Sequence, residues 1–221
     1  MPSVRDAVAE ALQSAALQPV AVRSIVATLP SPANAEVGAL DVVAGYDLLR
    51  YLAAGTRVFA AAPQPALLEE IYRKMTAGKG FRPTARTLTV FSDHDVVVAQ
   101  ETAHGMLRGL FKPTECIRVV TAVSELARNI YLYAQTGEVR LDLAEQPDRT
   151  LLFSVLAADR GPGIAHLDEI LAGTYRSRTG LGKGLLGART LLEDLDIQTG
   201  PGGTRIRGFK RSRLPDVLRN P

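Results

Sequence analysis

A carboxylate and an amide stand four residues apart in the segment SELARN, at Glu125 and Asn129. If this segment is helical, residues at positions i and i+4 share one face, so the two side chains are neighbours. A carboxylate there can accept a proton from an attacking hydroxyl, and an amide oxygen can ligate Mg²⁺. The pair alone is weak support for a site, because exposed helix faces often carry Glu and Asn at this spacing.

A second candidate is the segment DRGPGI at 159–164, which follows an apolar run. Gly161 and Gly163 allow the backbone to turn sharply and to approach a ligand closely. Asp159, at the end of the expected strand, is placed to accept a hydrogen bond from the exocyclic amine of adenine. The alternative is a plain Asp-Gly turn, and the segment by itself favours that alternative.

A third candidate is the segment TGLGKGLLG at 179–187, which precedes an expected helix. Exposed backbone N–H groups and the positive end of a helix dipole suit phosphate, and Lys183 adds a charge. The segment does not follow a strand, as a dinucleotide-binding loop must, and Lys183 is followed by Gly184 instead of the Ser or Thr of a P-loop. The glycines of this segment are Gly180, Gly182, Gly184 and Gly187.

A fourth candidate is the segment GPGGTRI at 200–206. Thr204 begins the last expected strand, and a hydroxyl at this position can reach the adenine side of a nucleotide pocket. The alternative is an ordinary glycine-rich hairpin turn.

Taken in order, these four segments resemble the motifs of the Bergerat ATP-binding fold. The order is Glu-x-x-x-Asn on a helix, D-x-G-x-G after a strand, G-x-G-x-G before a helix, and G-G-T before a strand. This fold defines the GHKL superfamily, which includes gyrase, Hsp90, histidine kinases and MutL. The resemblance implies an α+β protein whose Bergerat-type α/β sandwich has a mixed sheet with helices on one face. It also implies ATP and Mg²⁺ as ligands.

Within this superfamily, the segments SELARNIYLYA, DRGPGI and TGLGKGL are most similar to the RsbT-like anti-sigma regulatory serine/threonine kinases. The resemblance covers roughly residues 85–211. It implies that the protein phosphorylates a serine or threonine of a STAS-domain partner in a bacterial partner-switching pathway, of the stressosome or anti-sigma kind. A PP2C-type phosphatase is a second candidate partner.

The resemblance also implies a role for each matched position. Glu125 would be the general base and Asn129 the Mg²⁺ ligand. Asp159 would hold adenine, and Thr204 would support that contact. The glycines Gly161 and Gly163 would shape the adenine pocket, and Gly180, Gly182 and Gly184 would wrap the phosphates.

Three other functions are alternatives to this one. A histidine kinase needs a phosphoacceptor histidine on a hairpin before the ATPase domain, and no histidine precedes His94. A DNA-acting ATPase of the gyrase or MutL kind needs a transducer domain after the last strand, which we do not expect here. A non-catalytic ATP-binding adaptor that sequesters or activates a regulatory protein stays open as an alternative, although Glu125 favours catalysis.

The elements that must position these residues follow a break near 77–85, where Gly, Lys, Pro and Arg cluster. Apolar periodicity predicts an order of β-α-α-β-β-loop-α-β-β, typical of an α/β sandwich. The expected strands are at 87–91, 138–143, 150–157, 195–199 and 204–210, and the expected helices are at 94–110, 113–134 and 184–194.

The residues before the break, 1–80, are rich in Ala and Leu and form a second, mostly helical domain of unknown role. Its helices are expected at about 3–17, 45–54 and 64–77. We hold two hypotheses for it: a dimerisation or partner-docking module, which would make a homodimer, or a sensory domain. The kinase domain then spans 85–211, and a basic tail spans 212–221.

Composition excludes several classes of protein. The absence of Trp and the low aromatic content of 5% argue against an aromatic stacking surface for nucleic acid. The single cysteine, Cys116, excludes an internal disulfide and a cysteine zinc cluster. The N-terminus lacks the pattern of a signal peptide, and no apolar run approaches the roughly 18 residues of a membrane span. We therefore expect no membrane partner and a cytoplasmic location.

Overall fold

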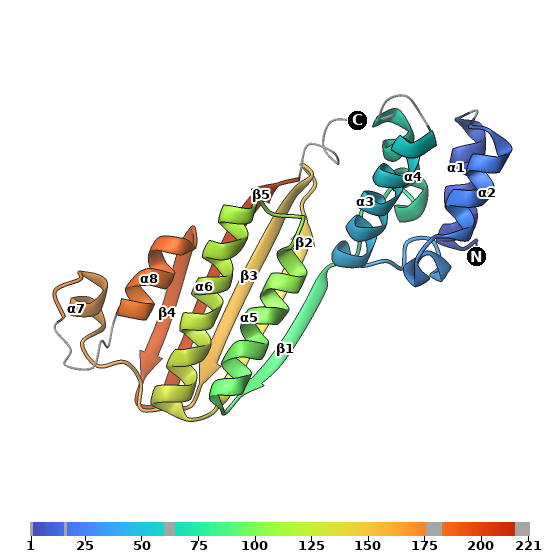
Figure 1. Ribbon diagram of the computed structural model, residues 1–221. Coiled ribbons are helices and arrows are strands. Elements are labelled where there is room, and N and C mark those ends of the chain that lie inside the picture. Colours follow the sequence, from blue (N-terminus) through green and yellow to red (C-terminus); the bar gives the residue numbers. More distant parts are fainter. Residues whose placement is uncertain (1, 16, 60–64, 176–182, 215–221) are drawn as a thin grey trace. The chain divides into compact units, whose positions relative to one another are not determined.

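The computed structural model of the protein describes residues 2–15, 17–59, 65–175 and 183–214 (Figure 1). Contacts between these residues divide the chain into two units. The first unit contains the described residues up to Thr84, the segment 144–151, and Arg213 with Leu214. The second contains residues 85–143 and the described residues of 152–212. The segment 144–151 therefore belongs with the N-terminal helices, although it is far from them in the sequence.

The first unit is helical. Helix α1 begins at a capping box, in which the Ser3 hydroxyl accepts from the Asp6 N–H and the Asp6 carboxylate accepts from the Ser3 N–H. Helix α2 was not predicted, although Pro19 at its first position is a common helix start. The bounds are α1 Val4–Ser14, α2 Pro19–Ala27, the 3-10 helix η1 Ser31–Asn34, α3 Val42–Phe59 and α4 Pro65–Thr76.

A buried carboxylate, Glu145, lies among aromatic side chains in this unit. The Tyr46 hydroxyl donates to its Oε1 at 2.7 Å and the Tyr72 hydroxyl at 2.9 Å, while the Phe81 N–H donates to Oε2 at 3.4 Å. The Arg149 guanidinium lies 3.0 Å from Oε1 and 3.7 Å from the centre of the Tyr72 ring. Since the Arg149 Nε–H has no aligned acceptor among the described residues, this contact is an ion pair without a hydrogen bond.

The second unit alternates strands with helices in the predicted order. Its additional elements are the π-helical turn η2 and the short helix α7. The bounds are β1 Thr84–Val90, α5 Asp93–Leu107, α6 Pro113–Asn129, η2 Ile130–Ala134, β2 Gly137–Glu145, β3 Thr150–Asp159, α7 Leu167–Leu171, α8 Lys183–Leu191, β4 Asp194–Gly200 and β5 Gly203–Arg213.

The five strands form one sheet in the order β1-β2-β3-β5-β4. β4 and β5 pair antiparallel, and the strand arrows in Figure 1 alternate in direction across the sheet. We expected a mixed sheet, and the strands are antiparallel instead. The reason lies in the connection from β1 to β2, which contains two packed helices, α5 and α6. Two helices bring the chain back to the end of the sheet where β1 finished, so β2 runs the opposite way.

Helices α5, α6 and α8 cover one face of this sheet, so the predicted fold class is confirmed (Figure 1). β2 alternates as expected, with Val139, Leu141 and Leu143 fully buried. β3, predicted to be central, lies in the middle of the sheet. Each such buried aliphatic side chain contributes about 1.5–3 kcal/mol to folding. These contacts fix the helix α6 against the sheet and so fix the residues that it carries.

The second predicted helix ends earlier than expected. We predicted a helix over 113–134, but the α-helix stops at Asn129 and continues as the π-helical turn η2 to Ala134. Gln135 then takes a left-handed conformation, with φ of 64°. The wider turn brings Ala134 so close to Gly161 that a Cβ on that glycine would overlap it. Such π-turns often mark functional sites.

Within the described ranges, none of the helices combines the length and the apolar character that crossing a bilayer requires.

Candidate functional site

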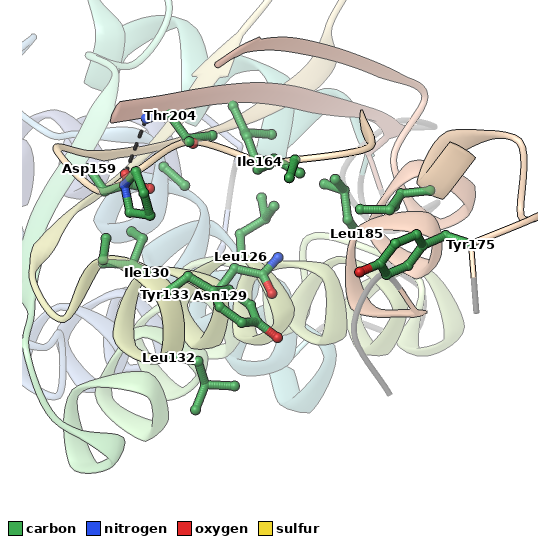
Figure 2. Close-up of a pocket in the computed structure, with 17 residues that line it drawn as sticks. Leu126, Asn129, Ile130, Leu132, Tyr133, Asp159, Ile164, Tyr175, Leu185 and Thr204 are labelled. Carbon is green, nitrogen blue, oxygen red and sulfur yellow. Dashed lines mark hydrogen bonds between the residues drawn. The ribbon is translucent and has the colours of Figure 1, made fainter. Parts of the chain in front are cut away.

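The second unit contains a cavity of about 310 Å³ between α6 and the ends of β3 and β5 (Figure 2). This volume falls within the range of small-molecule pockets. Its wall is mainly apolar, with a few polar groups at its edge. The apolar wall includes Leu126, Ile130, Ile164, Ile170, Leu185 and Ile206. A pocket of this kind suits a flat, largely apolar ring system whose orientation is fixed by a few hydrogen bonds.

Asp159 provides the main polar group of the cavity. Its Oδ1 accepts a hydrogen bond from the Gly161 N–H at 2.9 Å. It accepts another from the Thr204 N–H at 3.1 Å, drawn as a dashed line in Figure 2. Within the part of the chain that the structure describes, its Oδ2 has no donor. The carboxylate is therefore held by the backbone through one oxygen and keeps the other as an acceptor for a bound molecule.

Two threonines form a hydroxyl pair beside Asp159. Thr199 and Thr204 are directly opposite each other in the β4–β5 pair, and their Oγ1 atoms are 2.9 Å apart. The Thr199 hydroxyl also accepts from the Ile164 N–H at 2.8 Å. Thr204 was predicted, and it lines the cavity. Thr199 was not predicted, because its pairing with Thr204 is set by the register of the β4–β5 hairpin.

Glycines allow the turn after β3 to pack against the β4–β5 hairpin. Gly163 has φ of 83°, and a Cβ there would overlap the backbone of Gly200. Gly203 has φ of 129°, and a Cβ there would overlap the backbone carbonyl of Asp159. Side chains at either position would push the hairpin away from the turn. These glycines therefore keep the hydroxyl pair within reach of Asp159.

Helix α6 carries the predicted Glu125 and Asn129 on one face. Asn129 lines the cavity together with Asp159. Glu125 lies one turn earlier, with its carboxylate so close to Gly184 that a Cβ on the glycine would overlap it. Gly184 is the second residue of α8, so Glu125 is located at the N-terminal end of that helix. The structure thus places the carboxylate and the amide at adjoining positions, one at the helix start and one in the cavity.

The glycine-rich loop is only partly described. Lys183 is the first residue of α8, which begins one residue earlier than predicted. Gly180 and Gly182 lie outside the described residues. The N-terminus of a nine-residue helix carries free N–H groups and a partial positive charge, both of which favour an anion.

Two tyrosines of the cavity were missed in the sequence. Tyr133, in the π-helical turn, and Tyr175, after α7, both line it (Figure 2). Burial and the neighbouring Tyr175 raise the pKa of Tyr133 above its usual value. For Tyr133 a signal was present in the segment SELARNIYLYA, where tyrosines stand two and four residues after Asn129, but helical periodicity alone does not predict a π-turn.

The part of the chain that the structure describes contains no group of three or more His, Cys, Asp or Glu side chains arranged for a metal ion. Mg²⁺ commonly takes one or two protein ligands and completes its shell with phosphate oxygens and water. Asn129 is thus a fitting single ligand for a metal that arrives with a nucleotide.

Comparison with known proteins identifies the domain that holds this cavity. The model of the histidine kinase-like ATPase domain family matches residues 92–209, more than half of the chain. The chain belongs to this family. Its match includes every predicted site residue from Glu125 to Thr204, whereas the N-terminal helices lie outside it.

The chain also resembles individual members of related families. The serine/threonine-protein kinase RsbT of Bacillus subtilis (strain 168) is 32% identical over 124 residues, covering 55% of this chain and 92% of RsbT. In structure, the chain is similar to the histidine kinase domain of the blue-light activated histidine kinase from Erythrobacter litoralis EL346. That likeness has a TM-score of 0.34 and 16% identity, and covers 82% of this chain and 91% of the other.

These findings confirm the assignment to the GHKL superfamily and the similarity to RsbT. An ATPase domain of this family implies that the histidine kinase-like domain of this protein uses ATP. The geometry fits that implication, because the cavity pairs an apolar wall with a carboxylate that keeps one free acceptor.

Proposed function

We propose that this protein binds ATP with Mg²⁺ and transfers the γ-phosphate to a serine or threonine of a STAS-domain partner in a partner-switching pathway. The observation that carries the proposal is the arrangement on α6. Asn129 shares a cavity with Asp159, and Glu125 sits one turn away at the start of α8. The similarity to RsbT, named a serine/threonine-protein kinase, supports the choice of acceptor.

The proposed roles follow from the positions of the side chains. Asp159 Oδ2 accepts from the adenine amine, and the apolar wall holds the ring. Asn129 ligates Mg²⁺, and the N-terminal turn of α8 with Lys183, Gly180, Gly182 and Gly184 binds the phosphates. Mg²⁺, when bound with the nucleotide, neutralises phosphate charge that builds up during transfer.

Glu125 has the chemical role in this proposal. The oxygen of the partner hydroxyl forms a bond to the γ-phosphorus while the bond from that phosphorus to the bridging oxygen breaks. The hydroxyl proton passes to the Glu125 carboxylate, and ADP leaves with the bridging oxygen. The Glu125 carboxylate lies at the start of α8, beside the proposed phosphate-binding turn, and this position suits a base that accepts the proton during transfer.

We also propose that the protein works with two kinds of protein partner, a STAS-domain substrate and a PP2C-type phosphatase. The first unit is proposed to dock a partner or a second copy of the chain. The similarity to RsbT supports the STAS-domain partner, and the position of the first unit outside the family match supports a separate role for it.

Replacing the base tests the catalytic role. Glu125→Gln is expected to lower phosphate transfer to a STAS-domain partner by about a hundredfold or more, the scale of general-base catalysis. ADP affinity, measured by calorimetry, is expected to change less than threefold, a small difference on the scale of a single hydrogen bond. Glu101→Gln, an exposed position on α5, is the matched control. Transfer by Glu125→Gln at the wild-type rate would contradict the mechanism.

The same experiment separates the kinase from the non-catalytic adaptor. An adaptor binds ATP and its partner but incorporates no labelled phosphate, in the wild type as in Glu125→Gln. A wild-type protein that binds ADP and phosphorylates none of the STAS-domain proteins encoded near it would support the adaptor.

A further inference from the structure

We propose that Tyr175 binds the phosphate chain of the nucleotide through its hydroxyl, and that His166 is the positioning residue that holds the Tyr175 ring in place. This inference rests on the proposed nucleotide site and adds a hydroxyl donor to it. Neither residue belongs to the four sequence motifs. Both lie between the second and the third of them, on either side of the short helix α7.

Tyr175 lines the end of the cavity that lies away from Asp159. Figure 2 shows its ring near Leu185 of α8, and its hydroxyl points toward Asn129 and Tyr133. Burial, followed by Tyr175, raises the pKa of Tyr133, which agrees with a short distance between the two hydroxyls. Since Asn129 is the proposed Mg²⁺ ligand and α8 the proposed phosphate-binding helix, the phosphate chain would lie at this end.

The Tyr175 hydroxyl is available to a bound molecule. Among the described residues it has no hydrogen-bond acceptor, so its proton is not already used by the fold. A phenol hydroxyl donates one hydrogen bond, and a phosphate oxygen is a charged acceptor. Hydrogen bonds to a charged partner are about twice as strong as neutral ones. A donor that points toward the proposed Mg²⁺ ligand is therefore placed to bind a phosphate oxygen.

The ring of Tyr175 is held by His166, which directly precedes α7. The two rings are stacked, with centres 5.6 Å apart and planes inclined by 26°. Glu169 fixes both residues, because its carboxylate Oε1 lies 3.1 Å from His166 Nδ1 and its backbone carbonyl accepts from the Tyr175 N–H at 3.2 Å. The stack therefore sets the direction in which the Tyr175 hydroxyl points.

The backbone of His166 gives a second reason to assign its ring a role. It has φ of 56° and ψ of 34°, in the left-handed region that few residues other than glycine and asparagine adopt. The side chain is 56% exposed, so burial does not account for a histidine here. The bond from the Ile170 N–H to the His166 carbonyl, at 3.0 Å, needs only the backbone. The stack on Tyr175 is the interaction that requires a ring, and a functional role of that kind is where backbone strain is kept.

Removing the hydroxyl alone tests the phosphate contact. Tyr175→Phe keeps the ring and the stack, and its affinity for ADP with Mg²⁺ is expected to fall by about tenfold or more, the value of a hydrogen bond to a charged group. Adenosine has no phosphate, so its affinity should stay the same. Calorimetry on the full chain measures both. Tyr131→Phe, in the same unit but outside the cavity lining, is the matched control and should bind ADP like the wild type.

Two variants of His166 separate its ring from its backbone. His166→Asn fits the left-handed conformation but lacks the ring, so stability should be kept while ADP affinity falls by about twofold to tenfold, the value of an aromatic pair. His166→Phe keeps a ring but disfavours that conformation, so stability should fall while ADP affinity stays near that of the wild type. Urea denaturation measures the stability. Affinity that follows stability instead, tight in the asparagine variant and weak in the phenylalanine variant, would overturn the role of His166.

The outcomes distinguish this inference from the proposed function. A wild type that binds neither ADP nor adenosine would overturn the proposed nucleotide site and this inference with it. A wild type that binds ADP, with Tyr175→Phe binding it equally well or losing ADP and adenosine alike, would overturn this inference alone.

Discussion

Asp159 and Glu145 are two carboxylates at the ends of neighbouring strands, β3 and β2, and their surroundings differ in one respect. Glu145 is 4% exposed and receives two tyrosine hydroxyls, a backbone N–H and a guanidinium. Asp159 receives two backbone N–H groups on one oxygen and keeps the other open toward a cavity. Glu145 is saturated by its own unit, whereas Asp159 is not.

The difference separates stability from binding. A saturated buried carboxylate stabilises the fold only as long as all of its partners are present, because each partner left alone is a buried polar group without a bond. A carboxylate with an open oxygen contributes less to folding but can accept a hydrogen bond from a ligand. The number of donors around each group thus indicates its role.

The largest expected effect is on Glu145. Glu145→Ala leaves two tyrosine hydroxyls and the Arg149 guanidinium without their partner, which is expected to lower the free energy of unfolding by about 3–5 kcal/mol. Urea denaturation of the full chain measures this. Glu138→Ala, at the exposed start of β2, is the control and is expected to change stability by less than about 0.5 kcal/mol. Equal stability of the two variants would contradict the claim that the saturated Glu145 stabilises the fold.

The reverse pattern is expected at Asp159. In Asp159→Asn, the amide oxygen can still accept from both backbone N–H groups, so stability should hardly change. The open oxygen becomes an NH₂ donor, and ADP affinity is expected to fall by about tenfold to a hundredfold, the range for a charged hydrogen bond. Calorimetry measures the affinity, with Asp196→Asn on β4 as an exposed control. A variant that is clearly less stable but binds ADP as tightly as the wild type would assign Asp159 a structural role.

Alkaline pH tests the saturated cluster without removing its carboxylate. Burial, followed by the Glu145 charge, raises the pKa of Tyr46 and Tyr72 well above the usual value of 10.0. A raised folded-state pKa stabilises the protein below the unfolded pKa, and this stabilisation is lost as pH rises. Stability is therefore expected to fall above about pH 10. The fall should be shallower in Tyr46→Phe, and parallel curves for the two proteins would contradict this.

The smallest effect is expected at Asp95, a half-buried carboxylate at the start of α5 whose three donors all bond one oxygen, Oδ2. Its carboxylate accepts from Ser92 Oγ, from the Ser92 N–H and from the Phe91 N–H, and these hydrogen bonds lower its pKa. Asp95→Ala is expected to destabilise the chain less than Glu145→Ala at pH 7. Because the pKa of Asp95 is depressed, the difference in stability between the wild type and Asp95→Ala should vanish as pH falls through the folded-state pKa. A difference that persists in acid would mean that charge is not its source.

The sequence predicted those parts of the molecule that depend on apolar periodicity within a single helix or strand. Asn129, Asp159 and Thr204 line one cavity because each lies at the end of an element whose periodicity is visible in the chain. Strand direction was wrong, since periodicity does not report how two helices return the chain to a sheet. The π-helical turn at 130–134 was missed for a similar reason, because its apolar residues also fit a regular helix.

The sequence did not predict which groups the buried polar side chains contact. Glu145 is 99 residues from Tyr46 and 73 from Tyr72, and no spacing rule connects positions so far apart. Thr199 was equally hidden, because its pairing with Thr204 depends on a register that only the folded hairpin defines.

The membership of residues 144–151 in the first unit has a consequence for synthesis and for truncation. On the ribosome, Tyr46 and Tyr72 emerge long before Glu145, because residues 85–143 must be made first. The N-terminal helices therefore wait for a segment of the following domain before their polar cluster is complete. A fragment that ends at the break near 77–85 would contain Tyr46 and Tyr72 but would lack Glu145, the carboxylate that accepts their hydrogen bonds. An N-terminal fragment intended to fold by itself should have phenylalanine at both positions.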